Sequence, residues 1–192
     1  MFYLASRSPR RAQLLEAVGL EFSVLPPDVA EDILDGEAPE QTVERLAREK
    51  AAAGMFILHR DALPSHPVLA ADTVVVVEGR ILGKPERADE AYAMLEILSG
   101  RRHRVLTSVA LHLGASVQLK TSESFVTLKS LARWEIERYW ATGEPRDKAG
   151  GYAIQGIGGG FVARLEGSYS AVVGLPMFET RELLAIAGIG WL

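Results

Sequence analysis

The chain contains no cysteine among its 192 residues. Disulfide bonds, thiol nucleophiles and thiolate metal sites are therefore excluded. It also lacks an excess of basic residues, since 21 Lys and Arg stand against 25 Asp and Glu. The formal net charge of −4 argues against bulk binding of nucleic acid, which requires a basic surface. We therefore expect no nucleic-acid partner.

Long apolar runs are missing as well. The longest, residues 67–77, is interrupted by Asp72 and falls short of the roughly 18 residues that a membrane span needs. Arg7, Arg10 and Arg11 stand where the apolar part of a signal peptide would begin. We expect no membrane partner and a cytoplasmic location, which the lack of cysteine also fits. The sequence has no zinc-protease, serine-hydrolase, dinucleotide-binding or P-loop motif.

Hydroxyl and guanidinium groups follow the first apolar segment. Residues 2–5 are predicted to form a strand, and residues 9–19 a helix with Ser8 as its N-cap and a proline at its first position. The free N–H groups and the dipole of a helix start favour an anion. Arg10 and Arg11 add forked donors that match phosphate oxygens. The simplest ligand is a phosphorylated one.

An aspartate interrupts a second apolar segment, the strand predicted over residues 68–78. Burying Asp72 there is costly unless the carboxylate is paired, hydrogen-bonded or bound to a metal. It is either a structural residue at a strand bend or a general base or metal ligand. Thr73 beside it either donates to a substrate or is an ordinary strand residue.

Two lysines are candidate phosphate ligands. A helix predicted over residues 39–59 places Lys50 on its apolar side, seven residues after Val43, whereas Arg48 and Glu49 fit a solvated face. Lys84 lies between a glycine, which permits close backbone approach, and a proline that fixes the chain.

Glycine is concentrated in residues 150–160. This segment is either a plain flexible loop or a main chain that packs flat against a ligand. Gln155 within it carries a paired donor and acceptor that could read a base edge.

The remaining patterns complete a fold of the α/β class. Helices are expected over residues 88–98, 133–142 and 176–187, and strands over 22–25, 81–82, 102–113, 116–129, 161–165 and 169–173. Trp134, Tyr139 and Trp140 are interpreted as packing residues of a helix. Strands and helices mix without strict βαβ alternation, so we expect a mixed twisted sheet with flanking helices and not a Rossmann domain.

Six motifs, taken in order, closely resemble the Maf family and span almost the whole chain. They are S-x-S-P-R-R at 6–11, A-A-D-T-V-V at 70–75, G-K-P at 83–85, L-S-G-R-x-H-x-V at 98–105, D-K-A-G-x-Y-x-I-Q-G at 147–156 and G-S-Y-S-x-V-V-G-L-P at 167–176. The resemblance implies one domain over residues 1–192 and an elongated two-lobed fold with a central cleft, like that of inosine triphosphate pyrophosphatases.

The resemblance also implies an enzyme, a nucleoside triphosphate pyrophosphatase that cleans the nucleotide pool. The segment 147–156 is similar to that of the branch acting on dTTP and UTP. The alternatives are a 7-methyl-GTP pyrophosphatase and a nucleotide-binding regulator of septum formation. A homodimer is compatible with the sequence.

Residue roles are carried over by motif. The resemblance implies that Asp72 is the proton acceptor and that Arg10, Thr73 and Gln155 select the substrate. It assigns phosphate or metal contacts to five positions: Ser6, Arg11, Glu31, Lys50 and Lys84. Ser8 is a further candidate for substrate binding. Glu31 and Asp72 are the expected ligands of a divalent cation, Mg²⁺ or alternatively Mn²⁺ or Co²⁺, although Asp28 and Asp32 compete with Glu31 for this role.

Overall fold

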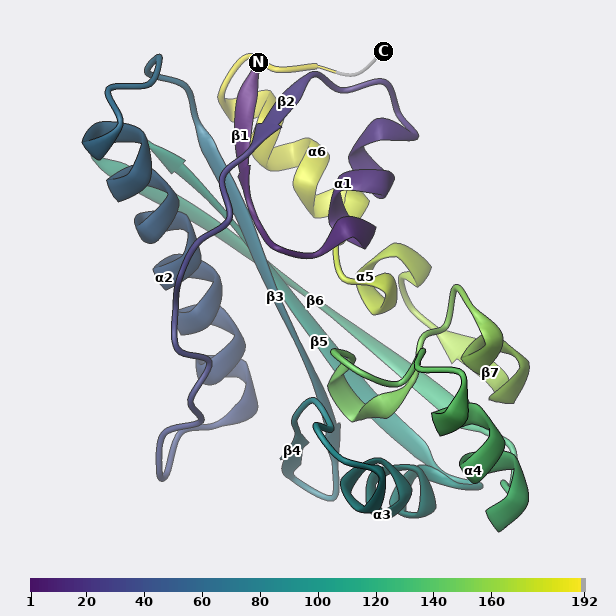
Figure 1. Ribbon diagram of the computed structural model, residues 1–192. Helices are drawn as coiled ribbons and strands as arrows, with labels where there is room; N and C mark the ends of the chain where they lie inside the picture. The colour runs from purple at the N-terminus through teal and green to yellow at the C-terminus, as the bar shows by residue number, and fades with distance from the viewer. Residues whose placement is uncertain (191–192) are drawn as a thin grey trace. The chain divides into compact units, whose positions relative to one another are not determined.

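The computed structural model describes residues 1–190 and shows a mixed α/β architecture (Figure 1). Seven strands form one sheet with the hydrogen-bonded order β2-β1-β3-β5-β6-β7, and β4 also pairs with β3. The strands are β1 (Phe2–Ala5), β2 (Phe22–Val24), β3 (Val68–Val77), β4 (Arg80–Leu82), β5 (Arg102–Leu113), β6 (Ser116–Leu128) and β7 (Val162–Glu166).

Six α-helices and two short 3₁₀ helices accompany these strands in the part of the chain that the structure describes. They are α1 (Pro9–Glu16), α2 (Pro39–Arg60), α3 (Ala88–Leu98), α4 (Arg133–Ala141), η1 (Ala149–Gly151), η2 (Ile157–Phe161), α5 (Tyr169–Val173) and α6 (Met177–Ile186). Among residues 1–190, no helix has both the length and the apolar character that crossing a bilayer demands. The predicted mixed sheet is confirmed.

The chain divides into two compact units, and the first contains residues 1–72, 107–122 and the segment from Gly174 onward. In this unit β1 pairs in parallel with both β2 and β3, so α1 and α2 are crossover helices. Figure 1 shows α2 on one side of β1 and β2, and α1 with α6 on the other. Two separate apolar clusters fill these two sides.

Helix α2 begins where the sequence predicts. Pro39 occupies its first turn, and the side-chain oxygen of Gln41 accepts a hydrogen bond from the N–H of Ala38 at 3.0 Å. Further along, Gly54 lets the helix approach the sheet closely. A Cβ atom there would lie 2.7 Å from Val68 Cγ1 and 2.8 Å from Ala5 Cβ. The spacing between α2 and the sheet therefore depends on the missing side chain.

The second unit contains residues 73–106 and 123–173. Strands β3 and β4 pair antiparallel there, as do β6 and β7. An apolar cluster collects side chains from β3, β5, β6, α3 and α4, with Leu95, Leu98 and Ile136 at most 1% exposed. His103 is buried in this unit, and its Nε2 lies 2.8 Å from the hydroxyl of Tyr152.

Three predictions about local structure were wrong. Residues 169–173 form the short helix α5 and not a strand, because Ser168 Oγ accepts a hydrogen bond from Ala171 N–H and caps it. A short apolar run alone does not distinguish these states. Helix α1 ends at Glu16, with Gly19 following at a φ of 71°. Trp134 is 59% exposed and does not pack in the core.

We expect Gly54→Ala to lower the free energy of unfolding. Alanine gains about 1 kcal/mol of helix propensity over glycine, but the forced separation of α2 from the sheet costs about 1–3 kcal/mol. Urea denaturation measures the balance. Gly160→Ala is the control, since a Cβ there meets nothing within 4 Å. A more stable Gly54→Ala variant would contradict the tight packing.

Burial lowers the pKa of His103 from 6.5 to about 4. Between these pH values the unfolded chain binds a proton that the folded chain excludes. The contribution of His103 to the free energy of unfolding is complete above the unfolded pKa and decreases as the pH falls toward 4. At pH 5 it is about 2 kcal/mol smaller than at high pH. Denaturation at pH 7 and pH 5 measures the loss, which should be smaller in His103→Gln. Equal pH dependence in both proteins would exclude His103 as the source.

Candidate functional site

The register of the parallel strands places Asp72 just beyond the carboxyl end of β1. Ala5, the last residue of β1, pairs with Ala70, so Asp72 lies two residues past the last pair of these strands. The chain leaves the sheet at Ser6 and enters α1 at Pro9. The carboxyl ends of parallel strands are where α/β sheets commonly present binding groups. A carboxylate inside an apolar strand thereby meets the polar start of a helix.

Lys50 reaches the Asp72 carboxylate from α2, the helix that connects β2 to β3. Gly54, one turn further along α2, contacts Val68 of β3, four residues before Asp72. The four residues from Val68 to Asp72 span about 13 Å along the strand, whereas one turn of α2 spans about 5 Å. The long lysine side chain covers the difference between these two distances. Lys50 Nζ donates to Asp72 Oδ1 at 2.6 Å, and the two residues are 6% and 5% exposed.

Glu31 is the second carboxylate on the same ammonium group. Lys50 Nζ lies 2.5 Å from Glu31 Oε1. Glu31 belongs to the acidic segment between β2 and α2, and Arg45 holds the adjoining part of that segment by donating to the backbone oxygen of Asp32 at 2.9 Å. Arg45 was not singled out from the sequence. Its position one helical turn from Glu49, with Glu37 before the helix, was the available signal.

Arg11 is anchored beside this cluster. Its Nε donates to the backbone oxygen of Gly174 at 2.7 Å and its Nη1 to Ser6 Oγ at 3.3 Å. Ser6 Oγ also accepts the N–H of Ser8 at 3.1 Å, so the predicted phosphate ligand Ser6 shapes the turn before α1. Ser8 occupies the N-cap position of α1 as predicted, but its side chain makes no capping hydrogen bond.

The electrostatics of Arg11 show which charges surround it. Burial lowers the pKa of Arg11, and the positive charge of Arg10 lowers it further. The charges of Asp72 and Glu31 act in the opposite direction and raise it. With Lys50, the cluster therefore combines three cationic groups and two carboxylates. Its cationic side chains suit a polyanionic ligand.

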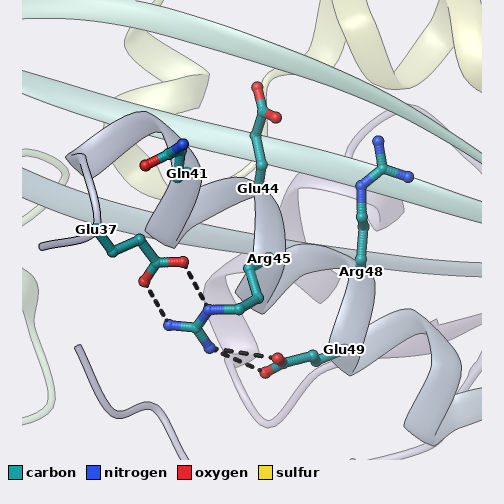
Figure 2. Close-up of a pocket in the computed structure, with 6 residues that line it drawn as sticks. All are labelled: Glu37, Gln41, Glu44, Arg45, Arg48 and Glu49. Carbon is teal, nitrogen blue, oxygen red and sulfur yellow. Dashed lines mark hydrogen bonds and ion pairs between the residues drawn. The ribbon is translucent and has the colours of Figure 1, made fainter. Parts of the chain in front are cut away.

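A hollow on the solvent side of α2 is lined by side chains other than those of the ionic cluster. Figure 2 shows its lining residues, which are Glu37, Gln41, Glu44, Arg45, Arg48 and Glu49. Arg45 ion-pairs with Glu37 at 2.7 Å and with Glu49 at 3.2 Å. The hydrogen bonds that Glu37 accepts from Arg45, with one from Thr42, lower the pKa of Glu37 to about 2. The predicted contrast is confirmed, since Arg48 and Glu49 face this hollow whereas Lys50 is buried.

The second unit brings two of the glycine motifs together. Gly150 donates its N–H to the backbone oxygen of Gly83 at 3.0 Å, so the loop carrying Lys84 adjoins the glycine-rich segment. Gly150 has a φ of 70°, and a Cβ there would lie 3.0 Å from Val75 Cγ1. Only a residue without a side chain fits this position easily. Thr73 is half-buried, and Lys84 is exposed.

Gln155 is exposed and lies in a segment that is ordered by hydrogen bonds. Glu144 accepts the N–H groups of Ile157 and Gly158, both at 2.9 Å. Tyr139 donates its hydroxyl to Glu144 at 2.8 Å and accepts the N–H of Ala153 at 3.0 Å. The interpretation as a plain flexible loop is therefore wrong. Sequence reasoning missed Glu144, for which no spacing signal exists.

The carboxylates Glu31 and Asp72 fit a divalent cation by their chemistry. Among residues 1–190 there is no group of three or more His, Asp or Glu side chains arranged to hold a metal. Two carboxylates are nevertheless enough for Mg²⁺ when substrate phosphates supply further oxygens. Both carboxylates converge on Lys50 Nζ through Oε1 of Glu31 and Oδ1 of Asp72, so a divalent cation would be held by their other oxygens.

Comparisons with known proteins extend these observations. The chain is 51% identical over 185 residues to the dTTP/UTP pyrophosphatase of Pseudoalteromonas atlantica, with 96% of each chain covered. It is 52% identical over 186 residues to the protein of that name from Chromobacterium violaceum, covering 97% of this chain and 94% of the other. Among solved structures, the Staphylococcus aureus Ham1 protein matches 66% of this chain and 71% of its own, with a TM-score of 0.42 and 17% identity.

The family comparison accounts for nearly the whole sequence. The model described as "Maf-like protein" matches residues 1–187. That range contains both units' polar groups: the ionic cluster of Glu31, Lys50 and Asp72, and the glycine-rich segment with Gln155. The chain therefore belongs to the family of Maf-like proteins.

Proposed function

We propose that this chain is a nucleoside triphosphate pyrophosphatase that hydrolyses dTTP and UTP to the nucleoside monophosphate and pyrophosphate. The observation that carries the proposal is the buried carboxylate of Asp72, held by Lys50 in a cluster with excess positive charge. Relatives about 50% identical over nearly their full length bear the name dTTP/UTP pyrophosphatase, which supports the same substrates. We place the enzyme in the cytoplasm, where nucleotide pools require removal of unwanted pyrimidine nucleotides.

The reaction we propose begins with the neutralisation of the triphosphate. Its roughly four negative charges hinder the approach of a water lone pair to phosphorus until cations offset them. Arg10, Arg11 and Lys84 would contact phosphate oxygens, with guanidinium forks matching their geometry. Ser6 and Ser8 adjoin this cluster at the start of α1.

Asp72 would then accept a proton from the attacking water. The water oxygen bonds to the α-phosphorus, and the bond from that phosphorus to the bridging oxygen breaks, so pyrophosphate leaves. General-base catalysis of this kind contributes typically ~10²–10⁴-fold. Lys50 orients the carboxylate through its hydrogen bond to Oδ1. Glu31 and Asp72 would hold a divalent cation, which when bound supplies charge stabilisation at the phosphate oxygens.

The proposed base preference rests on Thr73 and Gln155. A glutamine amide presents one acceptor and two donors, which suits the paired acceptor and donor of a uracil or thymine edge. We assign this contact to Gln155 because its segment is rigid at both sides. Thr73 and Arg10 are proposed as further selecting residues.

Asp72→Asn should reduce turnover by about 10²–10⁴-fold, because the amide cannot accept the proton of the attacking water. Glu31 still neutralises Lys50, so we expect a folded protein with a lower melting temperature. Steady-state kinetics normalised to the folded fraction measure the effect. Asp61→Asn, a surface change at the end of α2, is the control. Near-normal turnover of Asp72→Asn would remove Asp72 as the base.

The site of cleavage is tested by the products. We expect ³¹P NMR of a dTTP or UTP reaction with Mg²⁺ to show nucleoside monophosphate and pyrophosphate in equal amounts, because attack occurs at the α-phosphorus. A panel of canonical nucleotides run in parallel gives the base preference. Appearance of nucleoside diphosphate and orthophosphate would place the attack at the γ-phosphorus and reject the proposed reaction.

A further inference from the structure

A polar pair in the second unit fixes the backbone on both sides of Gln155. Tyr139 lies in α4 and Glu144 follows that helix by three residues. The Tyr139 hydroxyl accepts the N–H of Ala153, two residues before Gln155. The Glu144 carboxylate accepts the N–H of Ile157, two residues after Gln155, and the N–H of Gly158. The segment 154–156 is thus a short span between two fixed ends.

The glycines in and after this span lie close to the two side chains. A Cβ at Gly156 would lie 2.2 Å from Glu144 Oε2, and one at Gly158 would lie 2.5 Å from the Tyr139 hydroxyl. Beyond the span, a Cβ at Gly159 would lie 2.3 Å from the backbone oxygen of Ile154, which belongs to the span. The backbone at Gly156 and Gly158 therefore lies against the carboxylate and the phenol, which hold it through hydrogen bonds to Ala153, Ile157 and Gly158.

The two side chains also depend on each other. Burial works against the ionised form of Glu144, but hydrogen bonds from Gly158, Ile157 and Tyr139 outweigh it and lower the pKa of this carboxyl. Burial raises the pKa of Tyr139, and the neighbouring Glu144 raises it further. A carboxylate that only accepts and a phenol that donates to it therefore satisfy each other. At neutral pH the pair holds a single pattern of donors and acceptors.

We propose that Tyr139 and Glu144 are positioning residues for base selection, holding Gln155 where it reads the pyrimidine edge. This inference rests on the proposed function, and it adds two residues that do not themselves touch substrate. A displacement of about 1 Å at a recognition group is enough to cost up to ~10²-fold in rate. Discrimination between bases should therefore fall when either residue loses its hydrogen bonds, whereas the chemistry at Asp72 should not.

The test uses near-isosteric variants, Glu144→Gln and Tyr139→Phe, with Gln155→Ala as the reference. An amide at position 144 cannot accept all three hydrogen bonds, and phenylalanine loses both bonds of the hydroxyl. We expect the ratio of kcat/KM for UTP over CTP to fall about tenfold in each variant. The loss should lie mainly in KM for UTP. Glu137→Gln, at an exposed glutamate of α4 paired with Arg133, is the matched control and should leave the ratio unchanged.

Two further measurements separate positioning from general stability. Amide hydrogen exchange at Ile157 and Gly158 should accelerate in Glu144→Gln while the core strands keep their protection. The double variant Glu144→Gln/Gln155→Ala should discriminate no worse than Gln155→Ala alone, because both changes remove the same contact, that of Gln155 with the base. Additive losses, an unchanged ratio in Glu144→Gln, or an equal loss for every nucleotide would overturn the inference. A wild-type protein that hydrolyses no nucleotide would overturn the proposed function, and the inference with it.

Discussion

One buried ammonium group, that of Lys50, organises the polar part of the first unit. It binds Asp72 from the middle of β3 and Glu31 from the segment before α2. Removing charges from water is costly, and a buried ion pair often stabilises a fold no better than apolar side chains of the same size would. The cluster is therefore better explained by chemistry than by stability. Removing Lys50 would leave two carboxylates without this cation, so fold and site depend on the same contacts.

Close backbone approach is the second constraint, and both units use it. In the first, Gly54 brings α2 against β1 and β3, which sets the height at which Lys50 meets Asp72. In the second, Gly150 accommodates Val75, and the glycines near Gln155 lie on Glu144 and Tyr139. In each case the missing Cβ atom lets two segments approach closely, and this approach sets the position of a polar group several residues away. These glycines act through packing, not through flexibility.

The carboxylates of the two units illustrate how surroundings assign a role. Asp72 and Glu31 both pair with the ammonium group of Lys50. A bound anion could share this cation with the two carboxylates. Glu144 instead accepts hydrogen bonds from backbone N–H groups and from a phenol, so its carboxylate holds the main chain in place. A sequence shows three acidic residues of similar chemistry. Only their partners distinguish a carboxylate held by cations from one held by backbone N–H groups.

Much of the architecture followed from local patterns. Apolar spacing located α2 and the buried side of Lys50, and an aspartate within an apolar strand marked Asp72. The helix at 169–173 was missed because a short, mostly apolar segment suits either state, and the cap at Ser168 decides between them. Glu144 was missed because two of its three partners are backbone N–H groups, which leave no trace in residue types. Arg45 was missed although Glu49 stands one helical turn away, because its contact with the backbone of Asp32 joins distant residues.

The sequence by itself determined which residues are chemically capable and most of the helices and strands, since both depend on side-chain type and short-range spacing. The tertiary structure alone decided that Glu31, Lys50 and Asp72 meet, and that the glycine-rich segment is held rigid. Those contacts join residues far apart in the chain, and their existence depends on strand register and helix packing distances. No local pattern encodes these quantities.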